Sequence, residues 1–255
     1  MRLILFIVLS FFTIGLQAQN EAQKAFSEGV KLLKVKKFSE AEKLFEVAIE
    51  NGKAKEGLKM SYIYKGISLN GQTKYDGAIV DFSKAIELDS TDAASFVERG
   101  LAFSYKRDYD NAVVDFQRVL NIDSTGEQAQ AAFYYLGRIK SLQFKFEEAV
   151  NYLDKLIKLV PKDAEAYFLR GTAKSNQMEI DGAIADFDLA IKYRPNYMEA
   201  YANRGVQKLN KLPTKDKIGK KIKCLEEPCV DLLKAKELGD DSVDDMLFLY
   251  CKKCR

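Results

Sequence analysis

The sequence has no histidine and no tryptophan among its 255 residues, and the missing histidine restricts its chemistry most. Without histidine, the Ser-His and Cys-His arrangements of nucleophilic catalysis cannot be built, and the commonest metal ligand is missing. The phosphate-binding patterns GxGxxG and GxxxxGK[ST] do not occur. Adjacent carboxylates occur at Glu147/Glu148 and Asp240/Asp241, but neighbouring helical residues point apart, which is typical of a solvated face. We therefore expect no enzyme activity and no cofactor, and the alternative is a carboxylate site without a recognisable motif.

The chain also lacks an excess of charge of either sign. Forty basic and 37 acidic residues leave a net charge of +3. Binding of nucleic acid would require a basic stripe or domain, so nucleic acid is not an expected partner. No stretch rich in Pro, Gly and Ser divides the chain, which favours one continuous core over two linked domains.

Long apolar runs are confined to the N-terminus. Residues 1–18, MRLILFIVLSFFTIGLQA, combine one Arg, an apolar run and a small residue before Gln19. This is the layout of a secretory signal peptide, and the run is shorter than the roughly 20 residues of a membrane span. We expect cleavage before Gln19 and an exported, periplasmic or extracellular protein with no membrane span in its mature chain. An uncleaved anchor is the alternative. The first cysteine is Cys224, so a lipid anchor on an N-terminal cysteine is not expected.

Residues 93–126, AASFVERGLAFSYKRDYDNAVVDFQRVLNIDSTG, have the pattern of two amphipathic helices. Phe96, Gly100 and Phe103 recur at steps of four and three, which places them on one helical face. The second half repeats this spacing with Ala112, Phe116 and Val119. A glycine inside a helix costs about 1 kcal/mol relative to alanine, so Gly100 indicates close approach of another helix. Neither helix can bury its apolar face alone, so the unit must stack on a neighbour.

The same pattern recurs along the chain as a glycine, a small residue twelve positions later, and an apolar residue four beyond that. The sets are Gly29/Ala41/Phe45, Gly66/Ala78/Phe82, Gly100/Ala112/Phe116, Gly137/Ala149/Leu153 and Gly171/Ala183/Phe187. Successive glycines are 37, 34, 37, 34 and 34 residues apart, the last step reaching Gly205. The pattern resembles the tetratricopeptide repeat, a helix-turn-helix unit of about 34 residues. Tyrosine or phenylalanine replaces the family's Trp, and the family's late proline is present only as Pro161 and Pro195.

The resemblance implies an all-α, right-handed α-solenoid of about six helix-turn-helix repeats, whose first helices line the inner wall. We place the array at residues 19–239, with repeats at 22–55, 59–92, 93–126, 130–163, 164–197 and 198–239. A capping helix is expected at 240–255. The three extra residues before the second and fourth repeats are expected in loops between units.

The resemblance also implies a set of partner-binding residues on the first helices: Phe26, Ile63, Tyr64, Val97, Glu98, Tyr134, Tyr135, Arg138, Phe168 and Asn203. They would form a groove rich in aromatic side chains, with Glu98 and Arg138 as polar anchors, for an extended peptide or a partner helix. The alternative is that several of the aromatic residues pack between repeats. The Lys/Asn/Arg clamp with which some family members hold acidic C-termini of cytosolic chaperones is matched by Asn203 alone and opposed by Glu98.

The sixth repeat is irregular because its second helix is delayed to PCVDLLKAKEL by an insertion near residues 212–227. Around this insertion, seven lysines and Asp216 leave a charge of +6: Lys208, Lys211, Lys215, Lys217, Lys220, Lys221 and Lys223. One interpretation is contact with an acidic partner or an anionic surface, and the other is a solvated loop.

All four cysteines lie near the C-terminus: Cys224, Cys229, Cys251 and Cys254. In an exported chain, an even number of cysteines suggests disulfides, and three pairings are possible. Cys251 and Cys254 lie on one face of the expected capping helix, and Cys229 begins the helix that it should pack against. We therefore favour the pairs Cys229–Cys251 and Cys224–Cys254. A four-cysteine zinc site and a redox role for Cys251-x2-Cys254 are the alternatives, although no βαβ pattern accompanies the latter.

Together these features predict a non-enzymatic scaffold or adaptor that binds a peptide or partner protein in a concave groove, in association with the cell envelope. The alternative function is binding of a glycan or an anionic envelope surface through the groove aromatics and the lysine-rich insertion.

Overall fold

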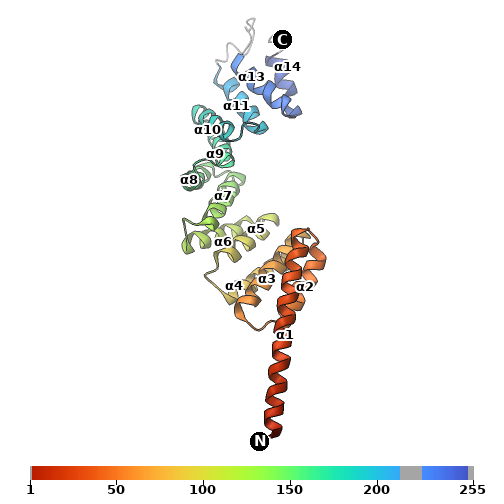
Figure 1. Ribbon diagram of the computed structural model, residues 1–255. Helices are drawn as coiled ribbons and strands as arrows, with labels where there is room; N and C mark the ends of the chain where they lie inside the picture. The colour runs from red at the N-terminus through yellow and green to blue at the C-terminus, as the bar shows by residue number, and fades with distance from the viewer. Residues whose placement is uncertain (1, 213–225, 252–255) are drawn as a thin grey trace. The chain divides into compact units, whose positions relative to one another are not determined.

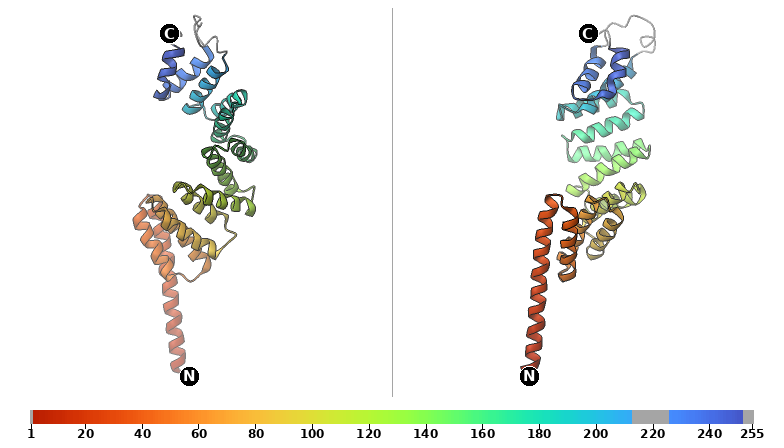
Figure 2. Two further views of the ribbon diagram at one scale, coloured as in Figure 1. Left: turned by 180° about the vertical axis from the view of Figure 1, so that it is seen from behind. Right: turned by 90° about the vertical axis from the view of Figure 1, so that its right-hand side faces the viewer.

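The computed structural model describes residues 2–212 and 226–251, and these residues fold into helices joined by short turns, with no strand among them (Figure 1). The chain divides into two compact units, Met1–Ala132 and Phe133–Arg255. The sequence had led us to expect one continuous core. Within each unit, antiparallel helical hairpins stack on one another (Figure 2). The all-α helical-repeat fold expected from the sequence is confirmed.

The first unit is built from the hairpins α1 (Arg2–Lys34) with α2 (Phe38–Asn51), α3 (Lys55–Gly71) with α4 (Tyr75–Leu88), and α5 (Ala93–Tyr105) with α6 (Tyr109–Ile122). Helix α7 (Glu127–Leu142) begins in this unit and ends in the next. The second unit continues with α8 (Phe146–Leu159), α9 (Ala164–Asn176), α10 (Ile180–Tyr193), α11 (Met198–Lys211), α13 (Glu226–Glu237), the 3-10 helix η1 (Asp241–Val243) and α14 (Asp244–Tyr250).

Helix α1 runs without a break through the expected cleavage position before Gln19, and the signal peptide stays a prediction. No helix in the described ranges is both long enough and apolar enough to cross a membrane.

The repeated glycines lie where the two helices of a hairpin make close contact. A Cβ atom at Gly66 would lie 2.6 Å from Cε1 of Phe82, and one at Gly100 would lie 3.0 Å from Cε1 of Phe116. Both phenylalanines are fully buried. The close helix approach that the mid-helix glycines indicated is therefore confirmed.

A row of ion pairs links consecutive hairpins. Arg170 Nε donates to Oδ2 of Asp186 in its own hairpin at 2.9 Å, and Nη1 donates to Oδ1 of Asp154 in the preceding hairpin at 2.6 Å. The same arrangement recurs in Arg204/Asp231/Asp188 and, with a serine as the second partner, in Arg99/Asp115/Ser83. Each arginine thus joins its own hairpin to the hairpin before it.

Three hairpins depart from this row, and the first of them, α1–α2, has Glu28 and Leu44 at the two positions. Lys65 stands in the place of the arginine in the α3–α4 hairpin, with its Nζ 3.6 Å from Oδ2 of Asp81 and 3.3 Å from Oε1 of Glu46. Oδ2 of Asp81 is buried without a hydrogen bond, and burial raises the pKa of Asp81 although Lys65 lowers it. In the α7–α8 hairpin, the uncharged residues Leu136 and Tyr152 take the two positions.

The extra residues before the second and fourth repeats do not form loops, so that expectation was wrong. They lengthen the first helices, because α3 has 17 residues and α7 has 16, against 13 in α5 and in α9. Three residues are close to one helical turn of about 3.6, so the apolar stripe keeps nearly the same direction. Apart from Gly57, the added residues are Glu, Leu, Gln and Ala, which favour helix.

The turns inside the hairpins share one backbone feature. The residue two positions before the second helix has a positive φ of 59–62° in each case: Lys36, Thr73, Arg107, Phe144 and Met178. This left-handed conformation is uncommon for residues other than glycine and is strained for bulky ones. Phe144 and Met178 are also 81% exposed, so burial of their side chains does not offset the energetic cost of this backbone conformation.

The C-terminal hairpin is closed by a disulfide. Cys229 in α13 and Cys251 after α14 are bonded, with their Cα atoms 5.6 Å apart, and both are buried in the core with Leu232 and Val243. The first of the two expected pairings is confirmed, and two sulfurs bonded to each other are not the thiolates that a four-cysteine zinc site needs. Cys224 and Cys254, and with them the second expected pairing, lie outside the described residues. So does most of the lysine-rich insertion.

Candidate interaction site

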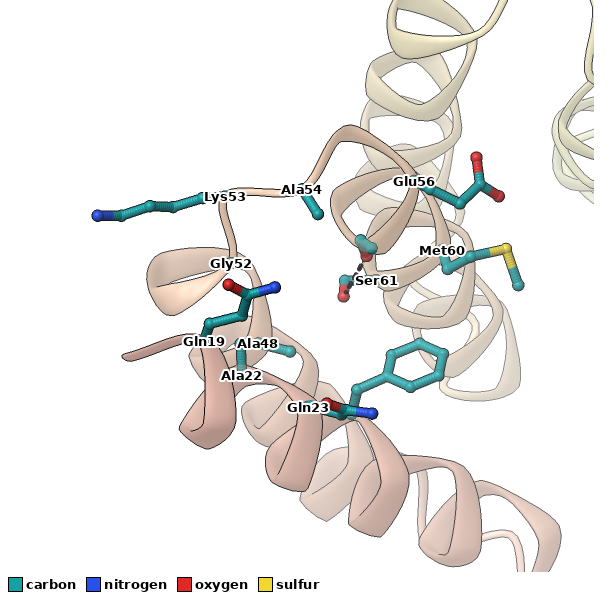
Figure 3. A pocket seen from close by; sticks show the side chains of 12 residues that line it. Gln19, Ala22, Gln23, Ala48, Gly52, Lys53, Ala54, Glu56, Met60 and Ser61 are labelled. Carbon is teal, nitrogen blue, oxygen red and sulfur yellow. Dashed lines mark hydrogen bonds between the residues drawn. The ribbon is translucent and has the colours of Figure 1, made fainter. Parts of the chain in front are cut away.

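The first unit contains an apolar pocket of about 280 Å³ between α1, the end of α2 and the start of α3 (Figure 3). It is lined by Gln19, Ala22, Gln23, Phe26, Ala48, Gly52, Lys53, Ala54, Glu56, Gly57, Met60 and Ser61. Small-molecule pockets usually measure about 300–1,000 Å³, so this one is slightly smaller than that range. Its size suits one apolar side chain of a larger partner.

The apolar walls come from three helices. Ala22 and Phe26 are one turn apart on α1, Ala48 is buried on α2, and Met60 lies across the pocket on α3. The ring of Phe26 packs edge-on against Tyr64 with the ring centroids 5.3 Å apart. Phe26 is therefore held in place by its own unit and still contributes to the pocket wall.

The pocket depends on the extra residues between the first two repeats. Five of the lining residues come from this part of the chain. The link between α2 and α3 contributes Gly52, Lys53 and Ala54, and the added first turn of α3 contributes Glu56 and Gly57. Of all the lining residues, sequence analysis had named only Phe26 as a binding residue. The signal that could have identified the others was the 37-residue spacing from Gly29 to Gly66, which marks the insertion.

An acidic cluster lies beside the pocket around the buried Lys59. Its Nζ is 3.1 Å from Glu56, 3.0 Å from Asp89 and 4.0 Å from Asp92, so three carboxylates share one ammonium group and leave two net negative charges. Burial alone would lower the pKa of Lys59, but its hydrogen bonds to Asp89 and Glu56 outweigh burial and raise it. Hydrogen bonds from Thr91, and then from Lys59, lower the pKa of Asp89 to about 2. The cluster is therefore anionic at neutral pH.

The other expected binding residues of the first unit differ in their accessibility. Tyr64 is half-buried beside Phe26, and Val97 and Glu98 are half-buried on α5. Burial raises the pKa of the Glu98 carboxyl. Ile63 is only 7% exposed and packs in a core cluster with Phe82, so it is a core residue that a partner could not reach in this conformation.

In the second unit, the structure brings Tyr134, Tyr135 and Arg138 together on α7. The two rings meet edge-on with centroids 5.0 Å apart, and the guanidinium carbon lies 5.5 Å from the first ring and 5.9 Å from the second. Arg138 is exposed, and burial raises the pKa of Tyr134, which keeps its hydroxyl protonated. The three side chains form a surface with apolar faces and one cation.

The remaining two expected residues lie apart from this trio. Phe168 on α9 is half-buried, with its ring centroid 4.8 Å from that of Tyr197 and 5.9 Å from that of Phe187. It packs between helices, as the alternative interpretation of the aromatic residues has it. Asn203 is half-buried on α11.

One carboxylate of each adjacent pair has a lysine partner. Glu148 pairs with Lys140 at 2.6 Å, and this hydrogen bond lowers the pKa of Glu148. Asp241 pairs with Lys236 at 2.6 Å, with the same effect on its pKa. A general acid needs a pKa raised toward the working pH, so the pKa values of Glu148 and Asp241 are shifted in the wrong direction for that role.

Two lysines at the start of the lysine-rich insertion are engaged within the second unit. Lys208 pairs with the buried Asp231 at 2.9 Å, and Lys211 pairs with Asp181 at 2.7 Å. The other five lysines of that group lie outside the described residues. Lys208 and Lys211 therefore take part in ion pairs within the chain, which weakens the interpretation that these two lysines contact an anionic surface.

The stacked hairpins, with a glycine at each helix contact and a row of ion pairs between neighbours, define the chain as a helical-repeat protein. The family model of the tetratricopeptide repeat matches residues 131–163 and 164–197. Residues 131–197 are therefore tetratricopeptide repeats, and these repeats support a role as a protein–protein interaction scaffold. No curated protein matches the chain.

Several solved structures have the same fold. YrrB, described as a tetratricopeptide repeat protein with an unusual peptide-binding site, is 26% identical, with a TM-score of 0.61 over 82% of this chain and 97% of that one. The C-terminal part of a repeat-containing protein from Cytophaga hutchinsonii is 20% identical, with a TM-score of 0.67 over 87% and 83%. MamA from Desulfovibrio magneticus RS-1 is 19% identical, with a TM-score of 0.62 over 73% and 97%.

Proposed function

We propose that the protein is a non-enzymatic scaffold that holds a peptide segment of a partner protein against the inner faces of its first helices. The observation that carries this proposal is the apolar pocket between α1, α2 and α3, which has room for one side chain. Gln23 lines the same pocket, and its carboxamide offers a donor and an acceptor to a peptide backbone. The similarity to YrrB, a tetratricopeptide repeat protein with an unusual peptide-binding site, supports the proposal.

The trio Tyr134, Tyr135 and Arg138 supplies a second contact in this proposal. Tyrosine and arginine are enriched at the energetic centres of protein interfaces, because they combine a large apolar area with polar groups. The exposed guanidinium above the two rings can meet a carboxylate or carbonyl group of the partner while the rings contact apolar groups.

We also propose that the protein is exported and works in the periplasm or outside the cell, in association with the envelope. The N-terminal apolar segment and the Cys229–Cys251 disulfide support this location, because disulfides persist in oxidising compartments. The intact mass of protein isolated from the exported fraction is expected to lack residues 1–18. Recovery of the full-length mass from the cytosol alone would refute the proposal.

The scaffold proposal is tested by crosslinking and affinity capture from the native envelope fraction. The bait is wild type, Phe26→Ala/Tyr64→Ala in the first unit, or Tyr134→Ala/Arg138→Ala in the second. Met178→Ala is the matched control, because Met178 is exposed on a hairpin turn away from the pocket. A partner that wild type and the control retain and that either double variant loses would support the proposal. Equal recovery with all four baits, each shown by circular dichroism to be folded, would refute it.

A further inference from the structure

We infer that the pocket of the first unit selects partner segments in which an apolar side chain stands close in sequence to a lysine or arginine. The inference rests on the proposed function and adds to it the chemistry of the ligand. The inference depends on the position of Glu56, which lines the apolar pocket and also belongs to the acidic cluster around Lys59.

The interior of the pocket accepts an apolar group and disfavours a charged one. Its walls are formed by Ala22, Phe26, Ala48 and Met60, and both alanines are buried. The hydroxyl of Ser61 donates to the carbonyl oxygen of Gly57 at 2.8 Å, so it is already engaged. An ionised side chain inside would lose its hydration without a matched partner, whereas a leucine or phenylalanine side chain would gain from burial.

The rim of the pocket sets the charge of the ligand. The Glu56 side chain is 73% exposed, and it shares the 9% exposed Lys59 with Asp89 and Asp92. Three carboxylates are thus balanced by a single cation. Lys53, the lysine of the lining, points away from the cavity in Figure 3. A basic group of the partner is therefore attracted to this rim and an acidic group is repelled.

The ligand chemistry is tested with synthetic probes whose binding to the purified protein is measured by fluorescence polarisation. The probes are end-blocked octapeptides of Gly and Ser that carry one Leu and, one to three residues to either side, a Lys, Ser or Glu. A further probe carries Lys without Leu. At the best spacing, the Leu/Lys peptide is expected to bind about two- to fivefold more tightly than Leu/Ser, as for an exposed charge pair. Leu/Glu is expected to bind more weakly than Leu/Ser, and the probe without Leu is expected not to bind measurably.

Two variants separate the apolar and the charged part of the site. Nothing lies within 4 Å of a Cβ placed at Gly57, so Gly57→Phe adds a ring at the pocket wall without a clash at Cβ. It is expected to weaken every Leu-containing probe at least tenfold. Glu56→Gln is expected to reduce the preference for Lys over Ser and to leave Leu/Ser binding unchanged. Glu179→Gln, which removes an exposed carboxylate in the second unit, is the matched control and should change neither.

The outcomes distinguish this inference from the proposed function. Equal binding of Leu/Glu and Leu/Lys would overturn the charge preference. Binding that Gly57→Phe leaves unchanged, in a variant with the wild-type circular dichroism spectrum, would overturn the pocket as the site. Failure of every probe to bind wild type would also overturn the inference. In each case the scaffold proposal would still be decided separately, by the capture experiment with the two double variants.

Discussion

Replacing Gly57 and Gly66 by alanine, one at a time, tests the packing of α3 with two identical chemical changes in one helix. A Cβ at Gly66 would lie 2.6, 2.8 and 2.9 Å from three ring atoms of Phe82. A Cβ at Gly57 would have nothing within 4 Å. We expect Gly57→Ala to stabilise the protein and Gly66→Ala to be neutral or destabilising.

The magnitudes follow from two opposing effects. Alanine in place of glycine gains up to about 1 kcal/mol of helix propensity, and less near a helix end such as Gly57. At Gly66 the same gain is opposed by overpacking, because Phe82 is fully buried and its ring cannot move aside freely. Overpacking typically costs about 1–3 kcal/mol, so Gly66→Ala should lie between neutral and about 2 kcal/mol destabilising. The two variants should then differ by about 1–3 kcal/mol.

The assay is urea unfolding followed by the helical circular dichroism signal. Repeat arrays can unfold in parts, so wild type and variants are compared at the transition that α3 affects, with the m-values checked for agreement. If Gly66→Ala raised the midpoint as much as Gly57→Ala, the glycine would not be there to admit the phenylalanine ring. The account of the repeated glycines given above would then be wrong.

Lys65→Arg should stabilise the protein by about 1 kcal/mol, because a guanidinium can bond both oxygens of Asp81, and urea unfolding would detect it. Because the pKa of Asp81 is raised in the folded state, the ionised carboxylate destabilises the folded protein at any pH above that pKa. The free energy of unfolding of wild type should therefore increase as the pH falls through the folded-state pKa of Asp81. Lys65→Arg should reduce this pH dependence, and an unchanged profile would contradict the role of Asp81. Phe144→Gly should raise the thermal midpoint by relieving a positive φ, a gain of up to about 1 kcal/mol, and a lower midpoint would show that the exposed ring contributes to stability. Reduction of Cys229–Cys251 should cost about 3 kcal/mol for its 22-residue separation, measured by chemical unfolding with and without reductant, and an unchanged midpoint would contradict this.

The features that the sequence predicted best are those that repeat locally. The glycine and aromatic positions recur at helical spacing, so the hairpins and the contact of Gly100 with Phe116 followed from periodicity alone. The pairing of Cys229 with Cys251 followed from their places on two helices that must pack together. In both cases short-range regularity determined which faces meet.

The ion-pair row was present in the sequence but was not identified from it. Arg99 and Asp115 are 16 residues apart, and so are Arg170 and Asp186. This recurring spacing joins equivalent positions of the first and second helix in a hairpin. The 16-residue spacing can be recognised only after the repeats are aligned, because oppositely charged residues 16 apart are common in any sequence that is 30% charged.

The pocket could not be predicted because it depends on where extra residues are accommodated. The insertion before α3 could form a loop or extend the helix, and only the second choice places Glu56 and Gly57 at the pocket wall. Ile63 shows a related limit. Its helical position indicated the direction of its side chain, but how deeply it is buried depends on how tightly the neighbouring helices pack.

The row of ion pairs also bears on how such a chain can change in length during evolution. Each arginine takes one carboxylate from its own hairpin, and a partner from the hairpin before it, as Arg170 and Arg204 do. A duplicated block of 34 residues would copy one arginine, its own aspartate and the acceptor for the next arginine. Neighbouring hairpins could therefore be added or lost as whole blocks without leaving a buried charge unmatched.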